Sequence, residues 1–302
     1  MDVAIKSARY ATGRKKVVSL NHCYHGHTGL ALGTGDDLYS APFHSEGRPE
    51  DYGKVTLSDA GEMEQALAKG DAACVIIETI PATYGFPIPE PGYLKRVKEL
   101  CEKYGTLYIA DEVQTGLMRT GKMWGIEYEG VDPDILVTSK GFSGGIYPIA
   151  ATVVNKKAGK WLEEAGRMHS STFGGSDVGC VVAMKVLEIC SRPQTRVNVA
   201  EKAAYLRDGL ERIRSAVGAD FFSGIRQRGL VMGLEFNYPE GGKIVMRSLY
   251  ENGVWAIYSR LNPQVVQFKP GILIDTAYCD ELLEKLERGI RCVKDACSGK
   301  RG

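Results

Sequence analysis

The sequence predicts an α/β protein with a doubly wound, mostly parallel sheet, followed by a smaller α+β domain. In the first two-thirds of the chain, short β-branched runs alternate with amphipathic runs, as in successive βαβ units. Several of these short runs are apolar throughout, which is typical of strands covered on both faces. Beyond residue 177 the pattern changes to long helices separated by a few short strands, which indicates a second domain.

The predicted elements of the first domain follow that alternation. Its strands are expected at residues 16–20, 73–78, 106–112, 135–139 and 151–155. A helix is expected over residues 93–104, where the apolar side chains recur at helical spacing, and Gly105 would end it. The chain also opens on a helical pattern over residues 1–12.

The second domain is predicted to contain helices, strands and a break near Arg192–Pro193. The expected elements are helices at 177–191, 199–217, 243–252 and 280–296 and strands at 231–236, 265–268 and 272–274. We therefore divide the chain into a large domain, residues 1–195, and a C-terminal small domain, residues 196–302.

Composition excludes several classes of protein. The 302 residues carry 38 basic and 37 acidic side chains, so a nucleic-acid partner, which calls for a basic excess, is not expected. No apolar stretch is long enough to span a bilayer, and the first residues do not form a signal peptide. The eight cysteines form no C-x-x-C pair, which favours reduced thiols in a cytoplasmic protein.

Two residues at predicted strand ends are candidates for chemistry. Asp111 closes one strand, and Lys140 closes another and precedes a glycine-rich turn at 141–145. Ligands of open α/β sheets bind at the carboxyl ends of strands. A desolvated lysine is a nucleophilic amine suited to a Schiff base, and a carboxylate faces a cationic partner. Pyridoxal 5′-phosphate (PLP) needs this pair. Taken alone, such a lysine is more often a surface residue and such an aspartate a loop or cap residue.

Several segments in order resemble a known family. The run D-E-V-Q-T-G at 111–116 with R-T-G-K at 119–122 is similar to the signature of class III (ornithine/ω-type) PLP-dependent aminotransferases. Further similar segments are the lysine segment at 133–148, the aromatic-His-Gly motif at 24–26, the S-T-F-G-G turn at 171–175 and the R-G-L-V-M-G motif at 228–233. The resemblance implies a fold type I PLP-transferase large domain and covers essentially the whole chain.

The resemblance also implies roles for individual residues. Lys140 would carry the cofactor as a Schiff base and shuttle the substrate proton. Asp111 would pair with the pyridinium nitrogen, and Gln114 would approach the phenolic oxygen. Tyr24 would stack on the cofactor ring, although a tyrosine there could equally be a core residue.

Three more residues receive a role from the resemblance. His25 belongs to the aromatic-His-Gly motif, and Glu78 matches a glutamate near the cofactor. Thr172 would bind the cofactor phosphate across a homodimer, so that the two subunits share their active sites. The histidines of the 22–27 segment have no further ligands nearby, and we expect no metal there.

The chain departs from the family at three places. Relatives carry a further segment ahead of Met1, including a turn whose backbone binds phosphate, so the chain resembles a family member without its N-terminal segment. Gln267 and Thr83 stand where ornithine-type relatives pair an arginine with a glutamate. Ser176-Asp177 replaces Asn-Pro. The missing arginine predicts an amino donor other than an α-amino acid held by that clamp.

The expected function is transfer of an amino group between an amine or amino acid and a keto acid or aldehyde. Two alternatives remain open on the residues alone. One is another PLP reaction on the same fold, such as a racemase, lyase or decarboxylase reaction. The other is a truncated, non-catalytic remnant.

Overall fold

The computed structural model describes residues 1–45, 48 and 50–298 and divides the chain into two compact units. Unit 1 comprises residues 1–81, 89–117 and 124–189, and unit 2 comprises residues 82–88, 118–123 and those from 190 onward. Two short segments inside the predicted large domain therefore pack with unit 2. The division into folding domains after residue 195 stays a prediction.

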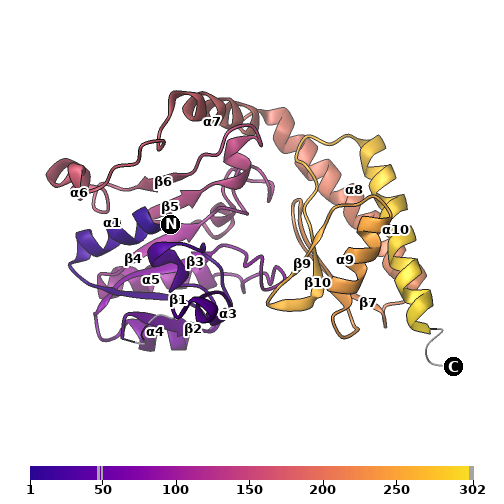
Figure 1. Cartoon of the computed structure of the whole chain (residues 1–302), viewed down its shortest axis with the longest axis horizontal. Helices are drawn as coiled ribbons and strands as arrows, with labels where there is room; N and C mark the ends of the chain where they lie inside the picture. Colours follow the sequence, from indigo (N-terminus) through magenta and orange to yellow (C-terminus); the bar gives the residue numbers. More distant parts are fainter. Residues whose placement is uncertain (46–47, 49, 299–302) are drawn as a thin grey trace. The chain divides into compact units, whose positions relative to one another are not determined.

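A six-stranded sheet forms the middle of unit 1 (Figure 1). In spatial order its strands are β2 (Tyr52–Val55), β1 (Lys16–Leu20), β3 (Ala72–Glu78), β4 (Leu107–Asp111), β5 (Ile135–Thr138) and β6 (Ala151–Val154). All neighbouring strands run parallel except β5 and β6, which are antiparallel. The predicted mostly parallel sheet is confirmed.

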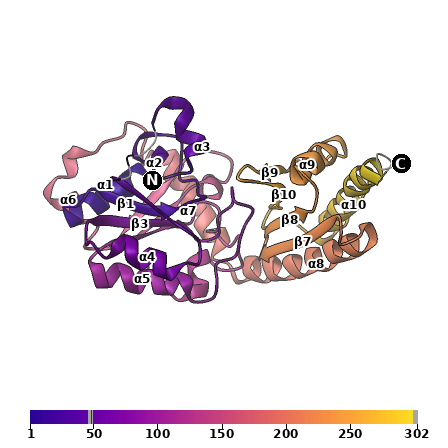
Figure 2. The same cartoon turned by 90° about the horizontal axis from the view of Figure 1, so that it is seen from below.

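Helices cover both faces of this sheet (Figure 2). On one face Val75 and Ile77 of β3 join a core with α4 (Ala60–Leu67) and α5 (Tyr93–Tyr104). On the other face the alternate residue Ile76 packs with α1 (Asp2–Thr12). Because successive side chains of a strand point to opposite faces, a strand apolar at every position belongs between two helical layers. The doubly wound arrangement follows from this pattern.

In its described residues, unit 1 contains three further short helices and one longer helix, α7. They are α2 (Gly29–Leu32), α3 (Asp37–Ser40), α6 (Lys160–Glu164) and α7 (Asp177–Cys190), with 3₁₀ turns at Ala41–Phe43, Gly125–Glu129, Lys140–Ser143 and Gly166–Met168. Helix α5 ends as predicted at Gly105, whose left-handed backbone (φ 66°) closes the helix.

Unit 2 is an antiparallel sheet packed against three helices (Figure 1). Its strands, in spatial order, are β7 (Phe222–Arg228), β8 (Val231–Phe236), β10 (Asn262–Phe268) and β9 (Ile257–Ser259), and its helices are α8 (Pro193–Val217), α9 (Gly241–Glu251) and α10 (Thr276–Ser298). One apolar cluster joins the helices to the sheet, with Phe222 stacked on Phe236. This is the predicted α+β layout.

The two inserted segments are held to unit 2 by backbone contacts. The N–H of Leu230 donates to the carbonyl of Arg119 at 2.9 Å. Gly229 beside it has a left-handed backbone (φ 58°), and a Cβ there would lie 2.4 Å from the carbonyl carbon of Thr120. Only glycine therefore allows the 118–123 segment to approach this closely.

Several local predictions differ from the structure. The strand predicted at 272–274 is wrong: Ile272 and Leu273 lie in a turn, and Leu273 is 62% exposed. Pro270, which has no N–H for a ladder, follows β10 and favours its end there. Helix α8 begins at Pro193 rather than at 199, because proline is tolerated in the first turn. Edge strands β2, β7 and β9 were not predicted. The mixed polarity of β2 and β7 hides the strand pattern, and β9 has only three residues.

Among the described residues, none of the helices combines the length and apolarity needed to cross a bilayer.

Candidate active site

The carboxyl ends of three neighbouring parallel strands meet at one cavity in unit 1. Glu78 ends β3 and lies directly opposite Asp111, which ends β4. Lys140 follows the end of the next strand, β5. The cavity has a volume of about 310 Å³ and is lined by these three residues together with Met1, Asp2, Tyr24, His25, Gly26, Thr28, Ala31, Val113, Gln114, Val137, Ser139 and Ala150.

Asp111 is buried and held from two sides. Its Oδ2 lies 2.8 Å from Nδ1 of His25, and its Oδ1 accepts the backbone N–H of Val113 at 3.1 Å. The His25 ring is fully buried, and its Nε2 has no hydrogen-bond partner. Burial by itself lowers the pKa of His25, but the neighbouring Cys23 and Asp111 side chains outweigh it and raise the pKa to about 10. The raised pKa favours a protonated ring, which donates to Asp111.

Lys140 has both an unusual backbone and a perturbed amine. Its φ of 48° lies in the left-handed region, which costs a residue with a Cβ on the order of 1 kcal/mol. Although part of the residue is exposed, desolvation lowers the pKa of its ammonium, while the charges of Asp111 and Glu78 act in the opposite direction. A lowered pKa increases the fraction of neutral, nucleophilic amine.

Glu78 and Tyr24 are connected at the same edge of the sheet. Oε1 of Glu78 accepts the backbone N–H of Tyr24 at 2.9 Å. Burial, together with the charges of Glu78 and Asp111, raises the pKa of the Tyr24 phenol. The phenol therefore stays neutral, and Tyr24 is the aromatic residue that borders the cavity next to Glu78 and Asp111.

Glu112 received no role from sequence reasoning, yet it organises the loop after β4. Its carboxylate accepts hydrogen bonds from the hydroxyls of Thr79 and Thr115, both at 2.6 Å, and from the backbone N–H groups of Gly125 and Ile126. Burial raises the pKa of Glu112 in spite of these four donors. The one signal in the sequence for such a network is a second charged residue, Glu112, directly after the end of the apolar strand β4.

Asp2 also lines the cavity without having been predicted. Its Oδ1 accepts the backbone N–H of Ala31 at 2.9 Å, and Oδ2 lies 3.3 Å from the Thr28 hydroxyl. The contact joins the start of α1 to the loop that follows Tyr24 and His25. Its signal in the sequence was an acidic residue in the first turn of a helix.

The structure brings six of the seven predicted site residues to this cavity, namely Tyr24, His25, Glu78, Asp111, Gln114 and Lys140. Thr172 is exposed in the loop before α7 and does not line it. In the described part of the chain, no group of three His, Cys, Asp or Glu side chains is arranged to hold a metal ion.

These residues fit PLP by their chemistry. An amine of lowered pKa, a carboxylate and an aromatic side chain border one cavity, whose volume lies at the lower end of small-molecule sites. The unpartnered Nε2 of buried His25 adds a polar group that a bound molecule or water would satisfy.

Comparisons with known proteins identify the family of this chain. Residues 1–290 match the family model for class III aminotransferases. An uncharacterized aminotransferase of Archaeoglobus fulgidus is 44% identical over 95% of this chain and 66% of its own length. An ornithine aminotransferase of Oceanobacillus iheyensis is 32% identical over 95% of this chain and 71% of its own length.

A solved structure of the ornithine aminotransferase from Toxoplasma gondii has a TM-score of 0.86 and 29% identity, covering 98% of this chain and 70% of that one. That structure has partial occupancy of PLP at its active site. The fold and these matches place the chain among the PLP-type transferases. The chain belongs to the class III aminotransferase family, which confirms the predicted family, fold type and cofactor. It spans about two-thirds of the length of these relatives.

Proposed function

We propose that this protein is a PLP-dependent aminotransferase that moves an amino group between an amine or amino acid and a keto acid or aldehyde. The observation that carries the proposal is the common cavity of Lys140 and Asp111, in which Nδ1 of His25 lies 2.8 Å from Oδ2 of Asp111. The family match supports the same reaction class.

Each residue has a distinct task in this proposal. The bound cofactor supplies an electron sink at the substrate carbon. Lys140 attaches the cofactor and, once its amine is free, accepts and returns the proton at that carbon. Asp111 stabilises positive charge on the ring nitrogen, and His25 keeps Asp111 ionised and fixed. Tyr24 packs against the flat ring, and Gln114 binds its polar edge.

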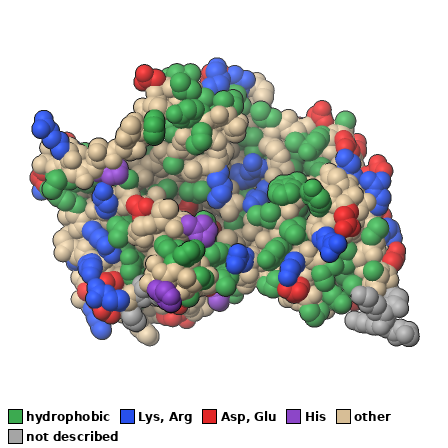
Figure 3. All heavy atoms as spheres, in the orientation of Figure 1, with side chains coloured by type: hydrophobic (Ala, Val, Ile, Leu, Met, Phe, Trp, Pro, Cys, Tyr) green, Lys and Arg blue, Asp and Glu red, His purple; other side chains and the backbone are tan. Residues whose placement is uncertain are grey.

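We also propose that the protein forms a homodimer in which Thr172 serves the second active site. The exposed position of Thr172, away from the cavity of its own unit, is consistent with this. Its neighbour Phe173 is 79% exposed. Helix α7 adds exposed apolar side chains, Val178, Val181 and Met184, and Figure 3 has hydrophobic surface at the top, where Figure 1 places α7. Burying such a surface in a dimer is favourable.

The cytoplasm is the compartment we propose. All eight cysteines are free thiols, and Cys23, Cys74 and Cys101 are buried within unit 1. Burial raises the pKa of the Cys74 thiol to about 12, so this thiol resists oxidation and metal binding.

Borohydride reduction of the protein incubated with PLP tests the assignment of Lys140. Peptide mapping should place the pyridoxyl group on Lys140, and Lys140→Ala should lose the label, whereas the exposed control Lys157→Ala should keep it. Label on another lysine would contradict the assignment. Release of a keto acid or aldehyde from the amino donor, without carbon dioxide or racemised donor, distinguishes transamination from the other PLP reactions.

A further inference from the structure

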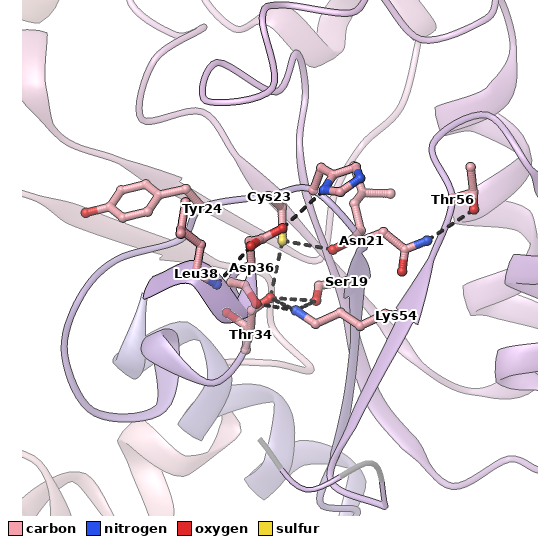
Figure 4. Close-up of polar contacts among 12 residues, drawn as sticks. Ser19, Asn21, Cys23, Tyr24, Thr34, Asp36, Leu38, Lys54 and Thr56 are labelled. Carbon is pink, nitrogen blue, oxygen red and sulfur yellow. Dashed lines mark hydrogen bonds and ion pairs between the residues drawn. The ribbon is translucent and has the colours of Figure 1, made fainter. Parts of the chain in front are cut away.

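The ammonium group of Lys54 makes hydrogen bonds close to the site, although Lys54 does not line the cavity. It lies on the edge strand β2, opposite Ser19 of β1. Its Nζ donates to the carbonyls of Thr34 and Gly35, each at 2.5 Å, and to the Ser19 hydroxyl at 3.2 Å (Figure 4). Three acceptors match the three N–H bonds of an ammonium group, so the donors of Lys54 are fully used.

The carbonyl of Thr34 is the common point of this cluster. Besides Lys54, it accepts the Ser19 hydroxyl at 2.7 Å and the Cys23 thiol at 3.2 Å. Two strands of the sheet and the residue before Tyr24 therefore converge on one peptide group. Hydrogen bonds to a charged donor are the stronger ones, and Lys54 supplies the one charged donor among these three.

Contacts continue from this peptide group to Tyr24. Asp36, two residues after Thr34, donates its N–H to the carbonyl of Cys23 at 3.0 Å. The carboxylate of Asp36 caps α3 by accepting the N–H of Leu38. Helix α3 carries Tyr39, whose ring meets the ring of Tyr24 edge-on at 5.1 Å between centroids. In Figure 4 the Tyr24 ring points away from the Lys54 cluster, on the far side of Asp36 and Leu38.

We propose that Lys54 is a positioning residue for the cofactor site, which sets the place of the Tyr24 ring through the carbonyls of Thr34 and Gly35. The inference rests on the proposed function only in that Tyr24 then faces the cofactor. Without the ammonium, the carbonyl of Gly35 loses its charged donor and that of Thr34 keeps only weaker ones. The support for α3 and Tyr39 then loosens, and with it the packing of Tyr24.

The first experiment needs no cofactor. Lys54→Met keeps the length of the side chain and removes its charge. In hydrogen exchange on the cofactor-free protein, the amides of Asp36 and Leu38 should exchange about tenfold faster, a change of the size expected for one charge-assisted hydrogen bond. Amides in α5 should not change. Lys54→Arg, which keeps a cation, should restore most of the protection.

Lys98→Met is the matched control, because Lys98 is also partly buried and donates to Asp134 at 2.9 Å, at a place remote from this loop. It should leave the exchange of Asp36 and Leu38 unchanged. Unchanged exchange in Lys54→Met, or equal acceleration in both variants, would overturn the proposal.

The second experiment is a double-mutant cycle on PLP affinity, followed by cofactor absorbance. Lys54→Met should weaken binding about tenfold when Tyr24 is present and by little when Tyr24 is alanine, because the two residues act in series. Equal losses in both backgrounds would refute action through Tyr24. If the unmodified protein forms no adduct at Lys140, the proposed function fails, while the exchange experiment still decides the role of Lys54.

Discussion

Nδ1 of His25 lies 2.8 Å from Oδ2 of Asp111, and this contact joins the loop after β1 to the end of β4. Both side chains are almost completely buried. A buried carboxylate is stable only when it is paired or hydrogen-bonded. His25 therefore fixes both the position and the charge of the carboxylate that we assign to the cofactor ring.

Asp111→Asn should slow transamination on the order of a hundredfold, because a neutral amide cannot balance positive charge on the ring nitrogen. The pyridoxyl group should still attach to Lys140 on reduction. Turnover with the best amino donor measures the effect, and the exposed control Asp132→Asn should behave as the unmodified protein. Unchanged turnover in Asp111→Asn would remove Asp111 from the proposed chemistry.

Replacing His25 should change how stability depends on pH. The folded pKa of about 10 lies above the ordinary value of 6.5, so the folded state binds the proton more tightly than the unfolded state. The resulting stabilisation is complete below about pH 6.5 and is lost as the pH rises toward 10. The difference in free energy of unfolding between the unmodified protein and His25→Asn should therefore shrink between pH 6 and pH 9.5. Urea unfolding at several pH values measures it, and a constant difference would contradict a protonated His25.

The amino donor should not be an α-amino acid held by an ornithine-type arginine clamp. The amide of Gln267 is used within unit 2: its Nε2 donates to the carbonyl of Ala82 at 2.9 Å, and its Oε1 accepts Nζ of Lys269 at 2.7 Å. Simple amines, ω- or β-amino acids or larger amino compounds should react faster in the half-reaction than ornithine, glutamate or alanine. Rapid reaction with glutamate at low concentration, unaffected by substitution of Lys269 or Arg260, would refute this.

A charge on α7 should disrupt the proposed dimer. Val181 is 65% exposed in the single chain, and Val181→Asp would place a carboxylate in the apolar surface that we assign to the interface. Light scattering should give the mass of a monomer for this variant and of a dimer for the unmodified protein. The control Lys69→Asp changes the charge at an exposed residue of unit 1 and should stay dimeric. A monomeric unmodified protein that binds PLP tightly would contradict the shared active site.

Gly229→Ala should destabilise unit 2 by about 2 kcal/mol or more, since it combines left-handed strain with a clash against the backbone of Thr120. Gly70→Ala is the matched control: Gly70 has a similar φ of 65° but open space around its Cβ position, so only the strain of about 1 kcal/mol remains. Thermal unfolding of both variants measures the difference. Equal losses of stability in the two variants would show that the 118–123 segment shifts and relieves the clash.

The sheet, and the two site residues at its strand ends, could be predicted from local sequence patterns. The apolar strands β3, β4 and β5 and helix α5 follow from side-chain periodicity, and Asp111 and Lys140 stand out because they end such strands. The resemblance to the family added Tyr24, His25, Glu78 and Gln114, which the structure places at the same cavity. Edge strand β7 escaped prediction because only one of its residues is fully buried, which leaves little apolar pattern.

The doubly wound sheet can be predicted from the sequence alone, because hydrophobic periodicity and strand ends are properties of neighbouring residues. Which side chains from distant segments meet is visible only in the folded chain. His25 binds Asp111, which lies 86 residues further along the chain. Lys54 of β2 donates to the carbonyl of Thr34 in the loop after α2. The folded chain also shows that the side-chain amide of Gln267 donates to a backbone carbonyl, that of Ala82. Such pairings depend on how the packed elements bring buried polar groups together. A local sequence pattern holds no information on the distance between two such groups.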